Sequence, residues 1–358
     1  MHAFHDTLPY TLESMEKKKL LLPYLQHLIL HHKCSCAAYR YFLDVKGYKQ
    51  EMVTDLCDIP FLPVRAFKEL DLKSIPEKNI FKTMTSSGTT GQRPSKIYLD
   101  KTNAVLQQKV LLRLLGDFVG TRRKPMLVID TPKIMISGGA FGTRSATLIG
   151  LRYAASQIVF ALHDDFSLDK EAIVCFLEKY SEEDFLVFGF TYMVWQYFFE
   201  ALHKENEEFD FSKGALLTTG GWKKLQDKAV SHEDFKEYGR KICKMGKFVD
   251  HYGMAEQTGS IYAECEYGHL HASIYSDVIT RRPKDFTPCE IGEPGIIQVL
   301  SVLPHSYPGH SLLTEDKGII LGEDDCPCGR KGKYIKVLGR ISRAELRGCS
   351  DTLESKRR

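Results

Sequence analysis

Four apolar segments of strand length recur through the middle of the chain, at residues 126–130, 157–160, 185–189 and 215–219. Their apolar residues are continuous rather than alternating, which is typical of parallel strands buried on both faces. Segments with the helical spacing of apolar residues, at 168–180 and 191–203, lie between them. Because parallel strands need crossover connections, this alternation predicts an α/β sheet with flanking helices.

The two ends of the chain have different patterns. Apolar residues between positions 11 and 41 fall largely on one helical face, which predicts helices at the start of the chain. Pro60 and Pro63 mark an extended connector, because a residue before proline is driven away from the helical region. Beyond about residue 259 the apolar segments are shorter and more alternating, and they predict antiparallel strands.

These patterns predict four segments in one globular protein. They are a helical N-terminal extension at 1–78, an α/β core at 79–258, an antiparallel subdomain at 259–338 and a C-terminal tail at 339–358. With 358 residues and 43% hydrophobic content, the chain is long enough to bury a substantial core.

Charge and cysteine content narrow the function classes. The 49 basic and 46 acidic residues are spread along the chain, which argues against nucleic acid as the main partner. No apolar run of about 18 residues predicts a membrane span, and the N-terminus lacks the pattern of a signal peptide, so we expect a cytoplasmic protein. Ten cysteines in so long a chain favour thiols, a metal site or a reactive cysteine over disulfides.

A loop of small and hydroxylated residues precedes a lysine at the start of the α/β core. It reads Thr85-Ser86-Ser87-Gly88-Thr89-Thr90-Gly91, and Lys96 follows it. Glycines let successive backbone N–H groups face an anion, hydroxyls add donors and lysine adds charge, so the loop suits phosphate oxygens. It is not a Walker loop, because four residues separate Gly91 from Lys96. The alternative is a polar hairpin that leads into a strand at residues 97–99.

With Pro94 and Lys96, the loop resembles the phosphate loop of the adenylate-forming superfamily, which includes acyl-CoA synthetases and luciferases. Two further motifs follow in that family's order. Thr219-Gly220-Gly221-Trp222 is similar to the glycine turn that lies against adenine, and His251-Tyr252-Gly253-Met254-Ala255-Glu256 is similar to the Tyr-Gly-x-Thr-Glu motif. The resemblance implies that ATP is the nucleotide and that Glu256 holds Mg²⁺ on its phosphates, while Ala255 replaces the usual threonine.

Two motifs near the C-terminus extend the resemblance. The segment Leu313-Thr314-Glu315-Asp316 is similar to a Thr-Gly-Asp motif whose aspartate binds the ribose hydroxyls, with Glu315 in place of glycine. Gly339-Arg340 is similar to the family's later Gly-Arg pair. The expected fold is therefore the N-terminal domain of an adenylate-forming enzyme, with a helical extension before it and an antiparallel subdomain after it.

The end of the chain, from Gly339 to Ser350, resembles the C-terminus of acyl-protein synthetases, relatives of the ligase subunit of the bacterial luminescence fatty-acid reductase. This resemblance implies that the mobile lid of most adenylate-forming enzymes is absent or truncated and that Cys349 accepts the acyl group. Arg343 and Arg347 lie close to Cys349 in the sequence and favour its thiolate. The alternative is an inert cysteine in a frayed tail.

A possible metal site is the Cys326-Pro327-Cys328 knuckle. Cys265 and His271, with His269 as a rival, would complete a Cys₃His set of the kind that structural Zn²⁺ prefers. The phenylacetate-CoA ligases carry a similar pattern. The alternative is a pair of reduced cysteines in a hairpin.

Together these features predict ATP-dependent activation of a carboxylic acid, such as a fatty acid, as an acyl-adenylate, followed by transfer to the thiol of Cys349 or of a partner protein. An acyl-CoA reductase or a carrier protein would be that partner. Two alternatives stay open: an acid–CoA ligase of the phenylacetate type, and a non-catalytic nucleotide-binding subunit of a larger acyl-transfer complex.

Overall fold

The computed structural model describes Phe4 and residues 6–85, 94–135, 143–222 and 229–341. The chain divides into two compact units, one of residues 1–110, 254–262 and 267–358, and the other of residues 111–253 and 263–266. The α-helices are α2 Ser14–Ser35, α3 Ala37–Val45, α4 Ala66–Glu69, α5 Lys101–Val119, α6 Thr143–Leu151, α7 Lys170–Tyr180, α8 Thr191–Val194, α9 Glu200–Glu205 and α10 His232–Cys243. A π-helical segment, Trp195–Phe199, joins α8 to α9.

The strands fall into a parallel set in the middle of the chain and a mainly antiparallel set around it. They are β1 Leu62–Pro63, β2 Lys82–Thr85, β3 Lys96–Leu99, β4 Lys124–Val128, β5 Ala155–Phe160, β6 Phe185–Phe190, β7 Gly214–Thr219, β8 Lys247–Tyr252, β9 Tyr262–Glu264, β10 Leu270–His271, β11 Ser276–Arg281, β12 Gly295–Ser301, β13 Ser311–Glu323 and β14 Lys333–Arg340.

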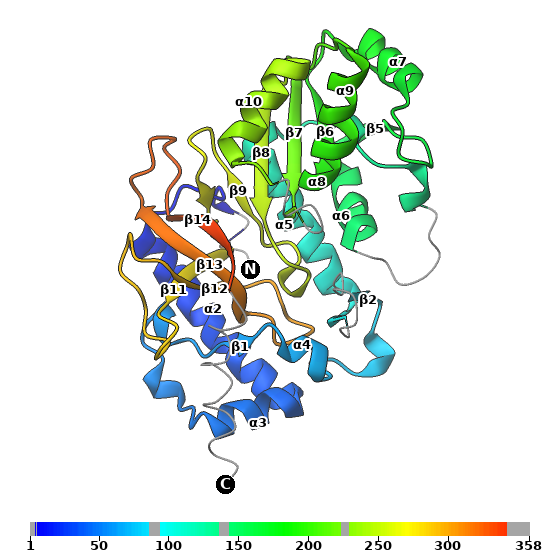
Figure 1. Cartoon of the computed structure of the whole chain (residues 1–358). Coiled ribbons are helices and arrows are strands. Elements are labelled where there is room, and N and C mark those ends of the chain that lie inside the picture. Colours follow the sequence, from blue (N-terminus) through cyan, green and yellow to red (C-terminus); the bar gives the residue numbers. More distant parts are fainter. Residues whose placement is uncertain (1–3, 5, 86–93, 136–142, 223–228, 342–358) are drawn as a thin grey trace. The chain divides into compact units, whose positions relative to one another are not determined.

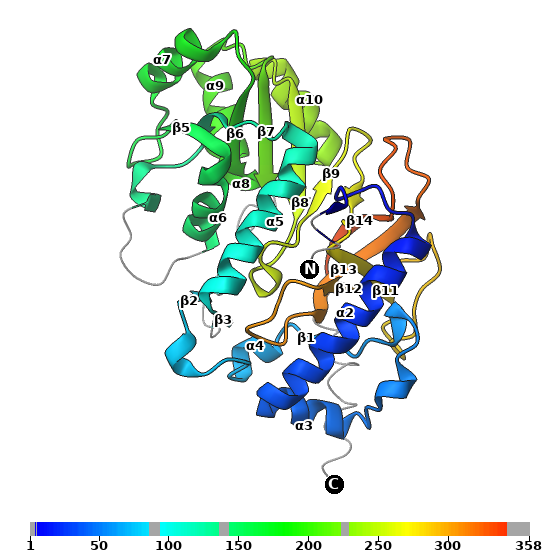
Figure 2. The same ribbon diagram turned by 180° about the vertical axis from the view of Figure 1, so that it is seen from behind.

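The second unit contains the parallel sheet that the apolar runs predict. Its strand order is β5-β4-β6-β7-β8, and each neighbouring pair is parallel. Every residue of β6 and β7 is buried, as expected for strands covered on both faces. Figures 1 and 2 view the chain from opposite sides and show α10 on one face of this sheet and α5 on the other. The predicted α/β architecture is therefore confirmed.

The first unit contains the antiparallel set. Its strands run in the order β11-β12-β13-β14-β10, and β1 pairs with β13 in parallel. Strands β2 and β3 form a separate antiparallel hairpin. The helical start predicted from residues 11–41 is confirmed as α2 and α3, which are separated by the extended residue Cys36. No described helix combines the length and apolar content needed to cross a membrane.

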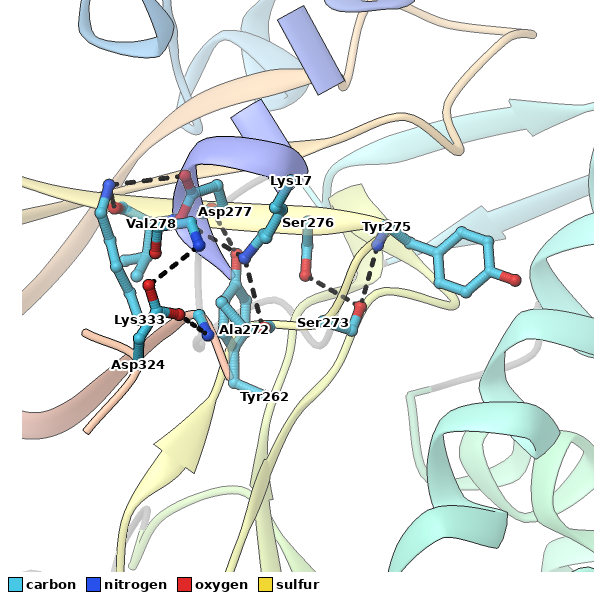
Figure 3. Close-up of polar contacts among 12 residues, drawn as sticks. Lys17, Tyr262, Ala272, Ser273, Tyr275, Ser276, Asp277, Val278, Asp324 and Lys333 are labelled. Atoms are coloured by element: carbon cyan, nitrogen blue, oxygen red, sulfur yellow. Dashed lines mark hydrogen bonds and ion pairs between the residues drawn. The ribbon is translucent and has the colours of Figure 1, made fainter. Parts of the chain in front are cut away.

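A buried ion pair attaches α2 to the antiparallel sheet. The Lys17 ammonium lies 3.7 Å from the Asp277 carboxylate, and their side chains are only 4% and 6% exposed. Lys17 also donates to the carbonyl of Ala272, and Lys333 lies 3.4 Å from Asp277 on the other side (Figure 3). Burial opposes ionisation of Asp277, but Lys333 and Lys17 hold its pKa below the usual value.

Removal of the Asp277 carboxylate should destabilise the protein strongly, because it leaves two ammonium groups out of water without their partner. We expect Asp277→Ala to lose about 3 kcal/mol of unfolding free energy in urea titration. The control is Asp44→Ala, which breaks the exposed Lys33–Asp44 pair and should cost less than about 1 kcal/mol. Equal small losses in both variants would contradict a structural role for the buried pair.

Candidate active site

The hairpin of β2 and β3 holds the two ends of the Ser/Thr/Gly loop. Thr85 ends β2 and lies opposite Lys96, which begins β3 with an exposed side chain. The loop therefore connects the two strands of a hairpin. This connection fits both predictions, the phosphate loop and the polar hairpin turn. The loop residues lie outside the described part of the chain: Ser86, Ser87, Gly88, Thr89, Thr90 and Gly91.

Glu256 is a carboxylate almost entirely removed from water. It lies in a short 3₁₀ turn after β8 and is 6% exposed. Burial raises its pKa, while the Ser95 hydroxyl and the charges of Lys68 and Arg340 favour the ionised form. A carboxylate in this environment is suited to bind a cation, because a cation offsets the cost of its buried charge.

The backbone around Glu256 is clamped to the connection between β12 and β13. The side-chain amide of Gln257 donates to the carbonyls of Val299 and Gly309, at 3.1 and 2.8 Å. A Cβ at Gly309 would lie 2.7 Å from the carbonyl oxygen of Glu256, so only glycine permits this approach. These contacts hold the backbone of Glu256 and Gln257 against the connection between β12 and β13.

Asp316 and Arg340 lie opposite each other where β13 pairs with β14. Arg340 lies 3.7 Å from carboxylate oxygens of both Asp316 and Glu315, and its side chain is 72% exposed. Glu315, which replaces the glycine of the related motif, also accepts hydrogen bonds from the guanidinium of Arg65 at 2.9 and 3.1 Å. Glu315 therefore links β13 to Arg65, a residue of the segment 1–78.

The second unit carries the glycine turn. Gly220 has a φ of +75°, and its carbonyl accepts a hydrogen bond from the Thr191 hydroxyl at 2.8 Å. A side chain at Gly221 would meet nothing within 4 Å. The turn therefore exposes backbone to solvent at the carboxyl end of β7, the edge at which ligands bind in sheets of this type.

The Tyr-Gly motif follows β8 in the same unit. His251 is buried, and burial lowers its pKa to about 4. Its Nδ1 has no hydrogen-bond partner among the described residues. Tyr252 is half-buried and Gly253 is exposed. A neutral imidazole with an unused buried nitrogen is suited to a polar ligand group.

The structure also contains a charged network that the sequence did not predict. Glu264 is 2% exposed, and one of its carboxylate oxygens lies 2.7 Å from both His232 and Lys236 on α10. Beside it, burial raises the pKa of Asp250 to about 6, and Asp250 accepts a hydrogen bond from Thr218. Thr218 lies just before the glycine turn and Asp250 lies just before the Tyr-Gly motif, so the network holds the carboxyl ends of β7 and β8. Glu264 and His232 are 32 residues apart, so no local sequence pattern predicts that they pair.

The predicted metal ligands come together. One ligand atom each from Cys265, His271, Cys326 and Cys328 lies within 4.8 Å of the others. Nε2 of His271 is 3.4 Å from Sγ of Cys328, and burial lowers the pKa of His271 to about 3, so its imidazole is neutral. The rival, His269, lies 3.2 Å from Sγ of Cys326. Three thiols and a neutral imidazole are a donor set that suits tetrahedral Zn²⁺.

Every described cysteine is a free thiol, as the sequence predicts. Cys349, the expected acyl acceptor, lies outside the described residues. Its role and those of the other predicted site residues therefore stay predictions.

Comparison with known proteins gives matches along nearly the whole chain. A family model described as acyl-protein synthetase, LuxE, matches residues 3–357. The long-chain-fatty-acid–luciferin-component ligase of Vibrio harveyi is 23% identical over 356 residues, which cover 94% of this chain and 87% of the relative. The ligase of the same name from Aliivibrio fischeri is 24% identical over 315 residues, which cover 82% of this chain and 77% of the relative.

Among solved structures, the open conformation of 2-hydroxyisobutyryl-CoA ligase, in complex with 2-HIB-AMP and CoA, is similar with a TM-score of 0.72. The two proteins are 16% identical, and the match covers 93% of this chain and 77% of that chain. This likeness confirms the predicted fold class, that of adenylate-forming enzymes.

Proposed function

Because the chain belongs to the acyl-protein synthetase (LuxE) family, we propose that it activates a long-chain fatty acid with ATP and passes the acyl group to a thiol. The observation that carries this proposal is Glu256. A carboxylate 6% exposed, whose ionised form is favoured by the Ser95 hydroxyl and by the charges of Lys68 and Arg340, is suited to act at a phosphate site. The chain is thus an ATP-dependent ligase.

In the first step, an oxygen of the substrate carboxylate attacks the α-phosphorus of ATP. The bond from that phosphorus to the bridging oxygen breaks, and pyrophosphate leaves with the bonding electron pair, so that an acyl-adenylate remains. Lys96 and the backbone of the loop from Thr85 to Gly91 would bind the phosphates in fixed positions. Mg²⁺ bound at Glu256 would offset the phosphate charge.

We assign the remaining contacts with the nucleotide to residues that the sequence motifs predict. Asp316 would accept hydrogen bonds from the ribose hydroxyls, with Arg340 holding its carboxylate. In the second unit, the turn at Gly220 and Gly221 and the segment from His251 to Gly253 would contact the nucleotide. The free Nδ1 of His251 supports such a contact, because a buried polar atom normally has a partner.

In the second step, a thiolate attacks the carbonyl carbon of the acyl-adenylate, AMP leaves and a thioester forms. We assign this thiolate to Cys349 or to a partner, either an acyl-CoA reductase or a carrier protein. Cationic neighbours such as Arg347 would lower the pKa of the Cys349 thiol and raise its thiolate fraction.

The first step has a direct test. The purified protein should catalyse ATP–pyrophosphate exchange that depends on an added long-chain fatty acid, and Glu256→Gln should lower the exchange rate by about 100-fold. Exchange requires a reversible adenylation step and no acceptor. Nucleotide binding without exchange, across aliphatic, aromatic and hydroxy acids, would instead indicate a non-catalytic subunit.

The second step is tested by mass. Incubation with the acid and ATP should leave an acyl adduct on the protein that hydroxylamine removes, and Cys349→Ser should abolish it while exchange continues. Cys175→Ser, which removes an exposed cysteine elsewhere, serves as the control and should keep the adduct. Formation of acyl-CoA without any protein adduct would favour the acid–CoA ligase.

We also propose that Cys265, His271, Cys326 and Cys328 hold a structural Zn²⁺. Metal analysis should find about one equivalent of zinc, and a chelator should lower the thermal transition. Cys328→Ser should lose the metal, whereas Cys289→Ser, outside the cluster, should keep it. Less than about half an equivalent in the unmodified protein would contradict a zinc site.

A further inference from the structure

A row of alternating charges crosses the first unit beside the proposed ribose site. Arg65 donates two hydrogen bonds to Oε1 of Glu315, from Nε at 3.1 Å and from Nη2 at 2.9 Å. The other carboxylate oxygen of Glu315 lies 3.7 Å from Arg340, which also lies 3.7 Å from a carboxylate oxygen of Asp316. Along this row the charges are therefore positive, negative, positive and negative.

An irregularity in β13 brings the carboxylates of Glu315 and Asp316 to the same arginine. Successive side chains of a regular strand point to opposite faces of the sheet. Where β13 pairs with β12, however, three residues of β13 at 314–316 lie opposite one residue of β12. Such bulges change the direction of side chains and are frequent next to active sites. Arg340, on β14, therefore approaches both carboxylates.

Other bonds hold the backbone on both sides of the contact between Arg65 and Glu315. Val64, which precedes Arg65, donates its N–H to the carbonyl of Leu313 at 2.9 Å. The carbonyl of Glu315 accepts a hydrogen bond from the N–H of Ile341 at 3.0 Å. Leu313 and Ile341 also belong to one buried apolar cluster. The two charged side chains thus meet from backbone positions that are already fixed.

Arg340 is equally close to the two carboxylates, and its side chain is 72% exposed. An exposed arginine keeps rotamer freedom, so its position depends on which carboxylate attracts it more strongly. Arg65 offsets the charge of Glu315 through two hydrogen bonds. This contact weakens the attraction of Glu315 for Arg340.

We propose that Arg65 is a positioning residue for the nucleotide. By binding Glu315, it leaves Arg340 to hold the carboxylate that would bind the ribose hydroxyls of ATP, that of Asp316. This inference rests on the proposed function. Without Arg65, the uncompensated carboxylate of Glu315 draws Arg340 toward itself. Asp316 then loses the arginine that holds its carboxylate in place.

The test measures the KM for ATP in ATP–pyrophosphate exchange with a long-chain fatty acid. Arg65→Met should raise this KM about fivefold and change kcat by less than about twofold, because a ribose contact is made equally in the ground state and the transition state. A change of about fivefold corresponds to about 1 kcal/mol, the upper limit for an exposed ion pair. Arg65→Lys keeps the charge and should give a smaller rise.

A second substitution separates positioning from a structural role. Glu315→Gln removes the competing charge, so the double variant with Arg65→Met and Glu315→Gln should return the KM for ATP to within about twofold of the unmodified value. Glu315→Gln alone should stay in the same range, because Arg340 then holds Asp316 without a competitor. Removal of Glu315 would not rescue an arginine that only supported the fold.

Arg282→Met is the matched control, since it breaks the partly exposed pair of Arg282 with Glu293; its KM for ATP should not change. A KM in Arg65→Met within about twofold of the unmodified value overturns the inference, and so does a double variant whose KM stays as high as that of Arg65→Met. Equal rises in Arg65→Met and Arg282→Met also overturn it. Absence of exchange in the unmodified protein overturns the proposed function and this inference with it.

Discussion

The burial of the Glu256 carboxylate is the constraint around which the first unit is organised. A carboxylate at 6% exposure is costly to ionise, and the chain compensates with a hydroxyl from Ser95 and cationic charge from Lys68 and Arg340. The glycine at 309 admits the backbone of Glu256, and Gln257 binds two carbonyls beside it. These contacts hold the backbone beside Glu256 in place, as the phosphate site that we propose would require.

Strand β13 connects this site to the rest of the unit. One end of β13 pairs with β1 and so positions α4, while its middle carries Glu315 and Asp316 and pairs with β14 at Arg340. Helix α2 is fixed to the same sheet through Lys17 and Asp277. The N-terminal extension is therefore an integral part of the first unit, because its contacts with the sheet are buried and charge-matched.

Sequence patterns predicted the elements well and the site in part. Continuous apolar runs identified β4, β6 and β7, because burial on both faces favours apolar residues at successive positions. The run at 157–160 also identified β5, although this strand lies at the edge of the sheet and its residues after Ala155 are exposed or half-buried. The Cys/His spacing predicted a cluster that the structure brings together. Ser95 and Lys68 were missed, because a buried serine and a half-buried lysine have no distinctive local pattern. Glu264 was missed for the same reason, since its partners lie on α10.

By itself the sequence determined the α/β class, the order of the motifs and the family resemblance, because these depend on local composition and on spacing along the chain. Only the tertiary structure decided which charges face one another. The sequence shows Glu315 only as a departure from a motif, whereas the structure shows that it binds Arg65, which is 250 residues away in the chain. Such pairings depend on strand register and on packing between distant segments, and a local sequence pattern does not predict them.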